Sequence, residues 1–213
     1  MAKESPKHQQ QMRARIAHLA ARMIAEDGIN DYSLAKRKAA RQAGAPDSRN
    51  LPTNEEIEDA LRAHQALYQR DEHPARLEHM RRLALTTMRL LEDFNPYLTG
   101  GVLSGGIGRH AEIHLQLYTD CPKDLEIFLH NREIPFRARE QRVWVGDQSS
   151  LVPTLALSTS EGQINLTVLP PAHRRQPLRL SPDGRALERA SIESVENLLD
   201  AAAADHDRED GVP

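Results

Sequence analysis

The sequence predicts an α+β protein in which a helical N-terminal region precedes a mixed β-sheet flanked by helices. Apolar residues recur at helical spacing through residue 94, and the period changes to two after Pro96. One helix and three consecutive strands are then expected in residues 121–170. We therefore expect a helical region over 1–94, an α+β domain over 95–200 and a disordered acidic tail over 201–213.

Four helices are expected in the first 94 residues. Ser5 and Pro6 are typical of an N-cap and a first turn, and Gly28 is typical of the stop of the same helix. Thr53 precedes Glu56 by three residues, which is the spacing of a capping box. These signals and the apolar periodicity predict helices over residues 5–28, 31–44, 51–70 and 73–94.

The strands are expected after Pro96. Alternation is strict in "AEIHLQLY", which places Glu112, His114 and Gln116 on one face of a strand. A long, proline-interrupted connection over 170–187 leads to a last helix from Ser191 to about Leu199. The predicted strands cover 96–103, 111–118, 135–145, 151–158 and 163–170, and a helix is predicted over 121–133.

Composition limits the function classes. The formal net charge is −3, which argues against binding driven mainly by counterion release. Aromatic residues make up 4% of the chain, too few for a surface that stacks many bases. Cys121 is the only cysteine, so a cysteine-rich metal site is excluded. The sequence has no apolar run of membrane-spanning length and no apolar core of a secretory signal, so we expect a cytoplasmic protein with no membrane partner.

Five glycines lie within residues 100–108, which indicates backbone freedom or the close approach of another group. Residues 106–111 match the loose dinucleotide-binding pattern, but that pattern requires a helix after the glycines, and an alternating strand is expected here. A nucleotide-binding phosphate loop is excluded as well, because no Gly-Lys-Ser/Thr closes the run.

The spacing in this segment resembles the motif of the DNA polymerase β-like nucleotidyltransferase superfamily. In these proteins a strand ends in Gly-Ser, another glycine follows in a short turn, and the next strand carries two aspartates two residues apart. Here Gly100 and Gly101 stand at the Gly-Ser position, Gly105 at the second glycine, and residues 111–115 at the acidic strand. The resemblance covers residues 75 to 170 in approximate terms and implies the fold of a small, divergent bacterial nucleotidyltransferase-like protein.

The resemblance also implies where a nucleoside triphosphate binds. Backbone amides at Gly100, Gly101 and Gly105 would contact its phosphates, with Arg109 as a further phosphate contact. In the family, three carboxylates hold two Mg²⁺ ions that activate the attacking hydroxyl and stabilise the leaving pyrophosphate.

The candidate catalytic and metal-binding residues are Glu112 and His114, which stand at the two aspartate positions. The third carboxylate would fall in residues 163–170, where the nearest candidate is the neutral Asn165. His114 offers a nitrogen where Mg²⁺ prefers oxygen, so the residues argue against ordinary two-metal catalysis. Mg²⁺ is expected only if the protein is active, with an unrecognised carboxylate such as Asp120 in the site.

Other residues suggest alternative sites. His110, Glu112 and His114 are also compatible with Zn²⁺ or Fe²⁺ if they share a strand face. Arg174 and Arg175 are candidate phosphate contacts in the 170–187 connection. A short helix is crowded with basic residues, and we favour a solvated face there over a patch for a nucleotide or RNA: Lys36, Arg37, Lys38 and Arg41.

Two function classes stay open after the sequence analysis. One is a divergent nucleotidyltransferase that transfers a nucleoside monophosphate from a nucleoside triphosphate to a hydroxyl or phosphate acceptor. The other is a degenerate, catalytically inactive relative that binds a nucleotide, RNA or a protein partner. The acceptor, the nucleotide preference and the oligomeric state have no signal in the sequence.

Overall fold

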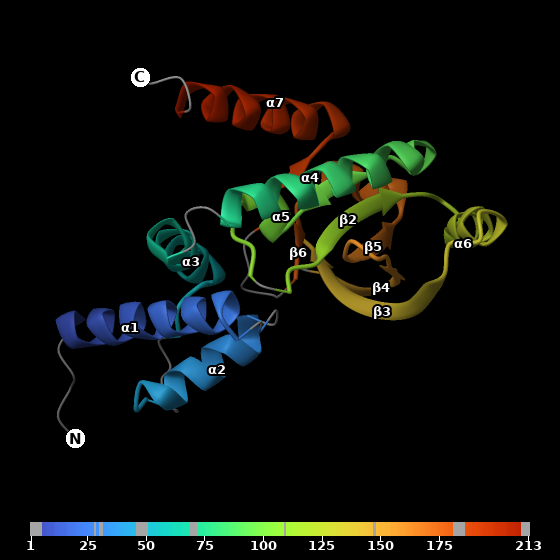
Figure 1. The fold of residues 1–213 in the computed structure, drawn as a ribbon. Helices are drawn as coiled ribbons and strands as arrows, with labels where there is room; N and C mark the ends of the chain where they lie inside the picture. The colour runs from blue at the N-terminus through green and yellow to red at the C-terminus, as the bar shows by residue number, and fades with distance from the viewer. Residues whose placement is uncertain are drawn as a thin grey trace. The chain divides into compact units, whose positions relative to one another are not determined.

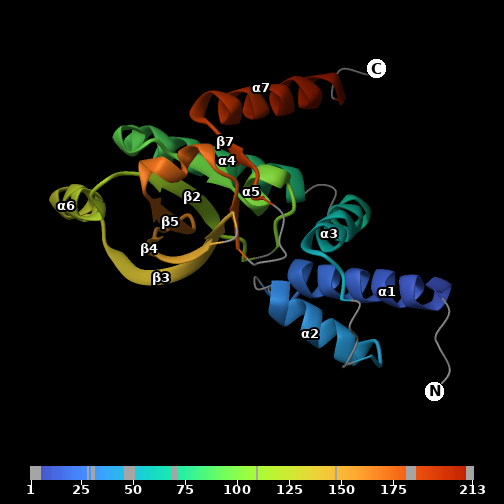
Figure 2. The same cartoon turned by 180° about the vertical axis from the view of Figure 1, so that it is seen from behind.

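The computed structural model describes residues 6–27, 29, 32–45, 51–68, 72–108, 110–146, 148–180 and 186–209. The chain divides into two compact units, one made of residues 1–74 with 105–111 and the other of residues 75–104 with 112–213. Helices and one curled, mixed sheet build these units, which confirms the predicted α+β class (Figures 1 and 2). None of the described helices is both long and apolar enough to cross a membrane.

The first unit is built around α1 (Pro6–Ala25), α2 (Tyr32–Gln42) and α3 (Asn54–Tyr68). Small side chains bring these helices together, and the largest residues of their shared core are Ile16, Ile57 and Leu61. On α2 the alanines are buried and three of the four basic residues are exposed, which agrees with the predicted solvated face. The predicted helix signals at Ser5 and Gly28 lie outside the described residues.

The capping box predicted at the start of α3 is confirmed. The backbone N–H of Thr53 donates to Glu56 Oε2 at 2.6 Å, and the backbone N–H of Glu56 donates to Thr53 Oγ1 at 3.2 Å. Glu56 also accepts from Arg13 Nε of α1 at 2.8 Å. One carboxylate therefore closes the N-terminus of α3 and ties it to α1.

Part of the glycine run belongs to this helical unit rather than to the sheet. A Cβ added at Gly108 would lie 2.4 Å from the backbone oxygen of Ile24, so only glycine allows this approach to the end of α1. The side chain of Gln65 on α3 donates to the backbone oxygen of Ile107. The group that lies against Gly108 is therefore the backbone of α1 at Ile24.

The second unit contains a seven-stranded sheet in the order β6-β3-β4-β5-β2-β1-β7. Only β2 and β5 pair in parallel, and the other pairs are antiparallel. The strands are β1 (Tyr97–Thr99), β2 (Ile113–Tyr118), β3 (Phe136–Val145), β4 (Gln148–Ser158), β5 (Gln163–Leu169), β6 (Leu178–Arg179) and β7 (Arg189–Ala190).

Two predicted strands are shorter than expected. The first predicted strand, 96–103, ends at Thr99, and the short helix α5 (Gly101–Ser104) follows it. The second begins at Ile113 instead of residue 111. Gly100 has a φ of +75°, which lets the chain turn directly from β1 into α5, and this conformation favours glycine.

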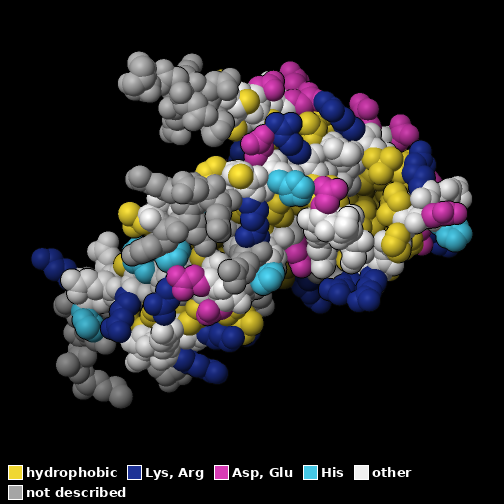
Figure 3. Space-filling model, in the orientation of Figure 1, with side chains coloured by type: hydrophobic (Ala, Val, Ile, Leu, Met, Phe, Trp, Pro, Cys, Tyr) yellow, Lys and Arg dark blue, Asp and Glu magenta, His cyan; other side chains and the backbone are white. Residues whose placement is uncertain are grey.

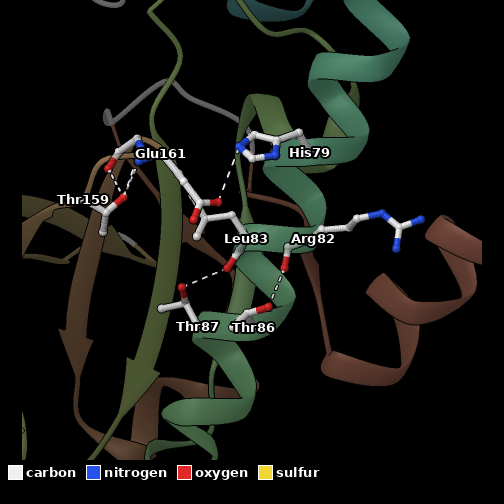
Figure 4. A network of polar contacts seen from close by, with 8 residues as sticks. His79, Arg82, Leu83, Thr86, Thr87, Thr159 and Glu161 are labelled. Carbon is white, nitrogen blue, oxygen red and sulfur yellow. Dashed lines mark hydrogen bonds and ion pairs between the residues drawn. The ribbon is translucent and has the colours of Figure 1, made fainter.

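Helix α4 (Glu72–Leu90) belongs to the second unit from Ala75 onward, so the units do not follow the predicted boundary at residue 95. Figure 4 shows α4 beside the turn between β4 and β5, where His79 Nε2 lies 3.6 Å from Glu161 Oε2. Arg81 on α4 donates to the backbone oxygens of Val102 and Leu103. These contacts place most of α4 in the sheet unit, although the sequence analysis grouped it with the helices of residues 1–94.

After β5 the chain forms both edge strands of the sheet. The 3₁₀ helix η2 (Pro171–Arg175) precedes β6 at one edge, and β7 forms the other edge. Leu187 N donates to Leu178 O at 2.7 Å, which joins the residues before β7 to β6. Leu178 and the partly buried Leu187 pack with Tyr118, Val143, Val145, Val152 and Leu169 in a second hydrophobic core.

Three further helices complete the second unit: η1 (Glu92–Phe94), α6 (Pro122–Asn131) and α7 (Ile192–Glu209). Phe128 of α6 packs edge-to-face on Phe94 at 5.3 Å, and Glu196 of α7 pairs with Arg89 of α4 at 2.6 Å. The predicted end of the last helix at about Leu199 is wrong, because α7 continues to Glu209 through a run of alanines with high helix propensity. Most of the predicted disordered tail is thus helical, and residues 210–213 lie outside the described part.

Candidate functional site

The candidate site lies on one face of the sheet, where strand pairing places polar residues side by side. Residues that are directly opposite in neighbouring strands share a face. Across the sheet the pairs join Arg189 to Thr99, Thr99 to His114, and His114 to Asn165. The row continues from Asn165 to Ala156 and Arg137. Sequence positions up to 90 apart therefore form one polar row.

Glu112 and Asn165 are in direct contact at this row. Asn165 Nδ2 donates to Glu112 Oε2 at 2.6 Å, and Glu112 stands just before the first residue of β2. The Asn165 amide therefore binds one carboxylate oxygen of Glu112. Of the three positions that the resemblance assigns to metal-binding carboxylates, only residue 112 is acidic. Asn165, the nearest candidate for the third carboxylate position, pairs with His114 and contacts Glu112.

His114 stands between Thr99 and Asn165 in the row. Surrounding protein atoms desolvate the imidazole and lower its pKa below the ordinary value, while the negative charge of Glu112 acts in the opposite direction. A neutral His114 is therefore favoured at neutral pH, and it offers nitrogen rather than a charged oxygen to any ligand.

The turn before α5 contributes backbone rather than side chains. A Cβ at Gly100 would lie 3.6 Å from the His114 ring, so the turn borders the polar row. The N–H groups of Leu103 and Ser104 both donate to the Gly100 oxygen at 3.0 Å. Gly100 and Gly101 belong to the second unit and Gly105 to the first, so the three glycines are not in one compact unit. Arg109 lies outside the described residues.

The other predicted metal ligands are not grouped. His110 is exposed and belongs to the first unit, whereas Glu112 and His114 belong to the second. Asp120 follows the end of β2 and Glu112 precedes its start, so the six-residue strand separates them by roughly 20 Å. Asp120 is therefore wrong as a partner of Glu112. Within the described ranges no three His, Cys, Asp or Glu side chains gather so that they could hold a metal ion.

A second polar row lies one step further along the same face. Gln116 on β2 pairs with Thr167 on β5, and Thr167 pairs with Thr154 on β4. All three side chains are buried. Gln141 of β3 accepts from both threonines at 3.4 Å. The alternation of "AEIHLQLY" indicated that Gln116 shares a face with His114, but no sequence signal marked its neighbours.

Basic side chains lie on both sides of this polar face. Figure 3 shows Lys and Arg side chains gathered over β3, where the exposed Arg137 and Arg139 share the face of the row and the exposed Arg142 lies on the opposite face. At the opposite edge Arg174 and Arg189 lie beside Tyr97. Sequence reasoning named Arg174 and Arg175 but missed Arg189, because its pairing with Thr99 joins residues far apart in the chain.

No family model, no curated protein and no solved structure matches this chain.

Proposed function

We propose that the second unit is a nucleotidyltransferase-like domain that binds a nucleoside triphosphate without transferring a nucleotide. The observation that carries the proposal is the composition of the row at Glu112, His114 and Asn165. A two-metal site requires carboxylates at these places, and here one carboxylate, one imidazole and one amide stand together.

The order of the elements supports the nucleotidyltransferase-like part of the proposal. A strand ends at a glycine turn, the next strand begins just after Glu112 and carries His114, and a neighbouring strand brings Asn165 beside them. This is the arrangement that the sequence resemblance implies for the nucleotide and metal positions. Gly100 keeps the φ that the turn needs.

The donor set does not fit two Mg²⁺ ions. Mg²⁺ prefers oxygen ligands in octahedral geometry and bridges substrate phosphates in such sites. His114 supplies nitrogen, Asn165 supplies a neutral amide, and the Asn165 amide already occupies Glu112. We therefore derive no step of nucleotide transfer through a metal at this row.

Titration calorimetry and pyrophosphate release test the two halves of the proposal. We expect weak, millimolar binding of at least one of the four ribonucleoside triphosphates to the wild-type chain. We also expect no Mg²⁺-dependent pyrophosphate release above the blank. If none of the four binds at millimolar concentration, with or without Mg²⁺, the polar face does not serve a nucleotide and the proposal is wrong.

Glu112→Gln separates binding from catalysis. The variant keeps the size of the side chain and removes its charge, so we expect it to leave pyrophosphate release at the blank level. Turnover by the wild type that disappears in Glu112→Gln would instead establish an active nucleotidyltransferase. In that case the protein has metal ligands other than His114 and Asn165.

A further inference from the structure

Two neighbouring cavities lie beside the polar face, next to η2 and the residues before β7. The larger, about 830 Å³, is lined by Tyr97, Pro171, Ala172, Arg174, Arg175 and Arg189. The smaller, about 310 Å³, is bordered by Gln116 and by residues on either side of β6. Arg175 and Arg189 line both cavities, so the two are adjacent and share these arginines. We call the hollow that the two cavities make together the arginine pocket.

Neutral groups hold two of the three arginines in place. Arg174 donates to Tyr97 Oη at 3.1 Å and to Asn95 Oδ1 at 3.2 Å, and Arg189 donates to Tyr118 Oη at 2.9 Å. The Arg174 and Arg189 guanidinium carbons also lie 5.7 and 5.2 Å from the centre of the Tyr97 ring. Both positive charges are thus oriented without being neutralised.

Arg175 lines both cavities, and its side chain has no hydrogen bond or ion pair with the described residues. None of the ion pairs within the described part of the chain involves Arg174 or Arg189 either. Guanidinium groups are always charged and present several donors in a fixed plane. Three such groups beside one hollow favour a ligand with more than one negative charge.

Gln116 borders the smaller cavity and supports one of the arginines. Its Oε1 accepts from Tyr118 Oη at 2.9 Å, and Tyr118 in turn accepts from Arg189. Gln116 is 3% exposed, so this chain of hydrogen bonds holds Arg189 from the buried side of the pocket.

We propose that the arginine pocket binds a diphosphate or triphosphate group, with Arg175 and Arg189 on its oxygens. The charged side chains that line the pocket in the described part of the chain are all donors, and a polyphosphate presents acceptors with several negative charges. This inference goes beyond the proposed function, because it assigns a site from the pocket itself and applies to inorganic pyrophosphate as well as to a nucleotide.

Calorimetric titration of the full chain with inorganic pyrophosphate tests the pocket. Arg175 touches no described partner, so Arg175→Ala removes a charge without removing a structural bond. We expect pyrophosphate to bind the wild type, about tenfold or more weaker binding to Arg175→Ala, and partial recovery in Arg175→Lys, which restores the charge without the planar fork. Arg82→Ala on α4 is the matched control, since it removes an exposed arginine far along the chain from the pocket, and it should bind like the wild type.

Gln116→Met keeps the length of the side chain and removes the acceptor of the Tyr118 hydroxyl, so it tests the support of Arg189 and not a direct contact with the ligand. We expect a smaller fall in pyrophosphate affinity than in Arg175→Ala, with the salt dependence of the wild type because the charges are unchanged. Equal affinities of wild type, Arg175→Ala and Arg82→Ala would overturn the inference. Pyrophosphate binding without nucleotide binding would support the pocket and refute the proposed function, and nucleotide binding unaffected by Arg175→Ala would do the reverse.

Discussion

The hydrogen bond from Asn165 Nδ2 to Glu112 Oε2 determines the electrostatics of the candidate site. The Asn165 amide thus gives the Glu112 carboxylate a neutral hydrogen-bond partner in the place where the resemblance implies a metal ion. A carboxylate at residue 165 would instead face Glu112 at hydrogen-bond distance, and the two like charges would need a proton or a cation between them.

Asn165→Asp should therefore make the protein depend on Mg²⁺. We expect a loss of about 1–3 kcal/mol in the free energy of unfolding at neutral pH without metal, from the lost bond and the added repulsion. Mg²⁺ should restore part of this loss, and adding His114→Asp should tighten Mg²⁺ binding further through a third oxygen donor. Thermal melting with and without Mg²⁺ measures both effects.

Asn165→Ala is the control, because it loses the same hydrogen bond without gaining a charge. It should show no response to Mg²⁺, and an equal response in Asn165→Asp and Asn165→Ala would contradict the explanation.

Gly108→Ala should destabilise the helical unit. The new Cβ would meet the backbone oxygen of Ile24 at 2.4 Å, a contact that cannot be relieved by turning a side chain. We expect a cost of about 1–3 kcal/mol, the range of overpacked cores. Gly162→Ala is the control in a denaturation experiment, because its Cβ would meet only Leu83 Cδ2 at 3.9 Å. Equal stabilities of the two variants would show that the chain at Gly108 can move away from α1.

At the scale of elements, sequence patterns correctly predicted the features that depend on residues close together in the chain. The capping box of Thr53 and Glu56 needs only four consecutive residues, and it was predicted correctly. The strand over 163–170 was also found, as β5. Helix α5 was missed because Val102 and Leu103 fit an extended pattern, and its short turn depends on Gly100 and on the Arg81 bonds from α4. Such long-range bonds leave no local pattern in the sequence.

The residues of the candidate site also differ in whether a local sequence pattern points to them. Glu112 and His114 were named as candidates because they lie two residues apart at one strand, and Asn165 because a neighbouring strand was expected; their roles stay predictions. Arg189 and Gln116 were not assigned a role, since they line one cavity with Arg175 and Leu178, and no local pattern predicts this grouping. The residues around Arg189 and Gln116 are brought together by the order in which the strands pair.

The Arg13–Glu56 pair should make the helical unit sensitive to acid. The bonds from Arg13 hold the pKa of Glu56 below its ordinary value of 4.5. A depressed folded-state pKa stabilises the unit above pH 4.5, and that contribution is lost as the pH falls through the lowered pKa. Glu56→Gln keeps a residue that suits the capping box and removes only the charge. We expect it to be less stable than the wild type at pH 7, by less than about 1 kcal/mol because both side chains are partly exposed.

Denaturant unfolding between pH 3 and pH 7 measures this difference, which should shrink toward zero at the acidic end. Arg13→Met provides the matched variant on the other side of the pair and should show the same loss of pH dependence. A stability difference that stays constant down to pH 3 would show that Glu56 acts through packing rather than through its charge.

At the scale of the whole molecule, each unit has a core of its own. Ile16, Ile57 and Leu61 belong to the core of the helical unit, whereas Tyr118, Val152 and Leu169 belong to a core of the sheet unit. The candidate row and the arginine pocket both lie in the second unit. The helical unit is therefore not needed to explain either site.

Cavity-forming variants should show whether the two units open independently. Leu61 in the helical unit and Leu166 in β5 are both fully buried, and their replacement by alanine is expected to cost about 2–5 kcal/mol each. Hydrogen exchange reports the opening of each region separately. Leu61→Ala should speed exchange in α1 and α3 and leave β2 and β5 unchanged, and Leu166→Ala should have the opposite pattern. If either variant instead speeds exchange equally in both units, the chain opens as a single cooperative body, and the separate cores do not confer separate stabilities.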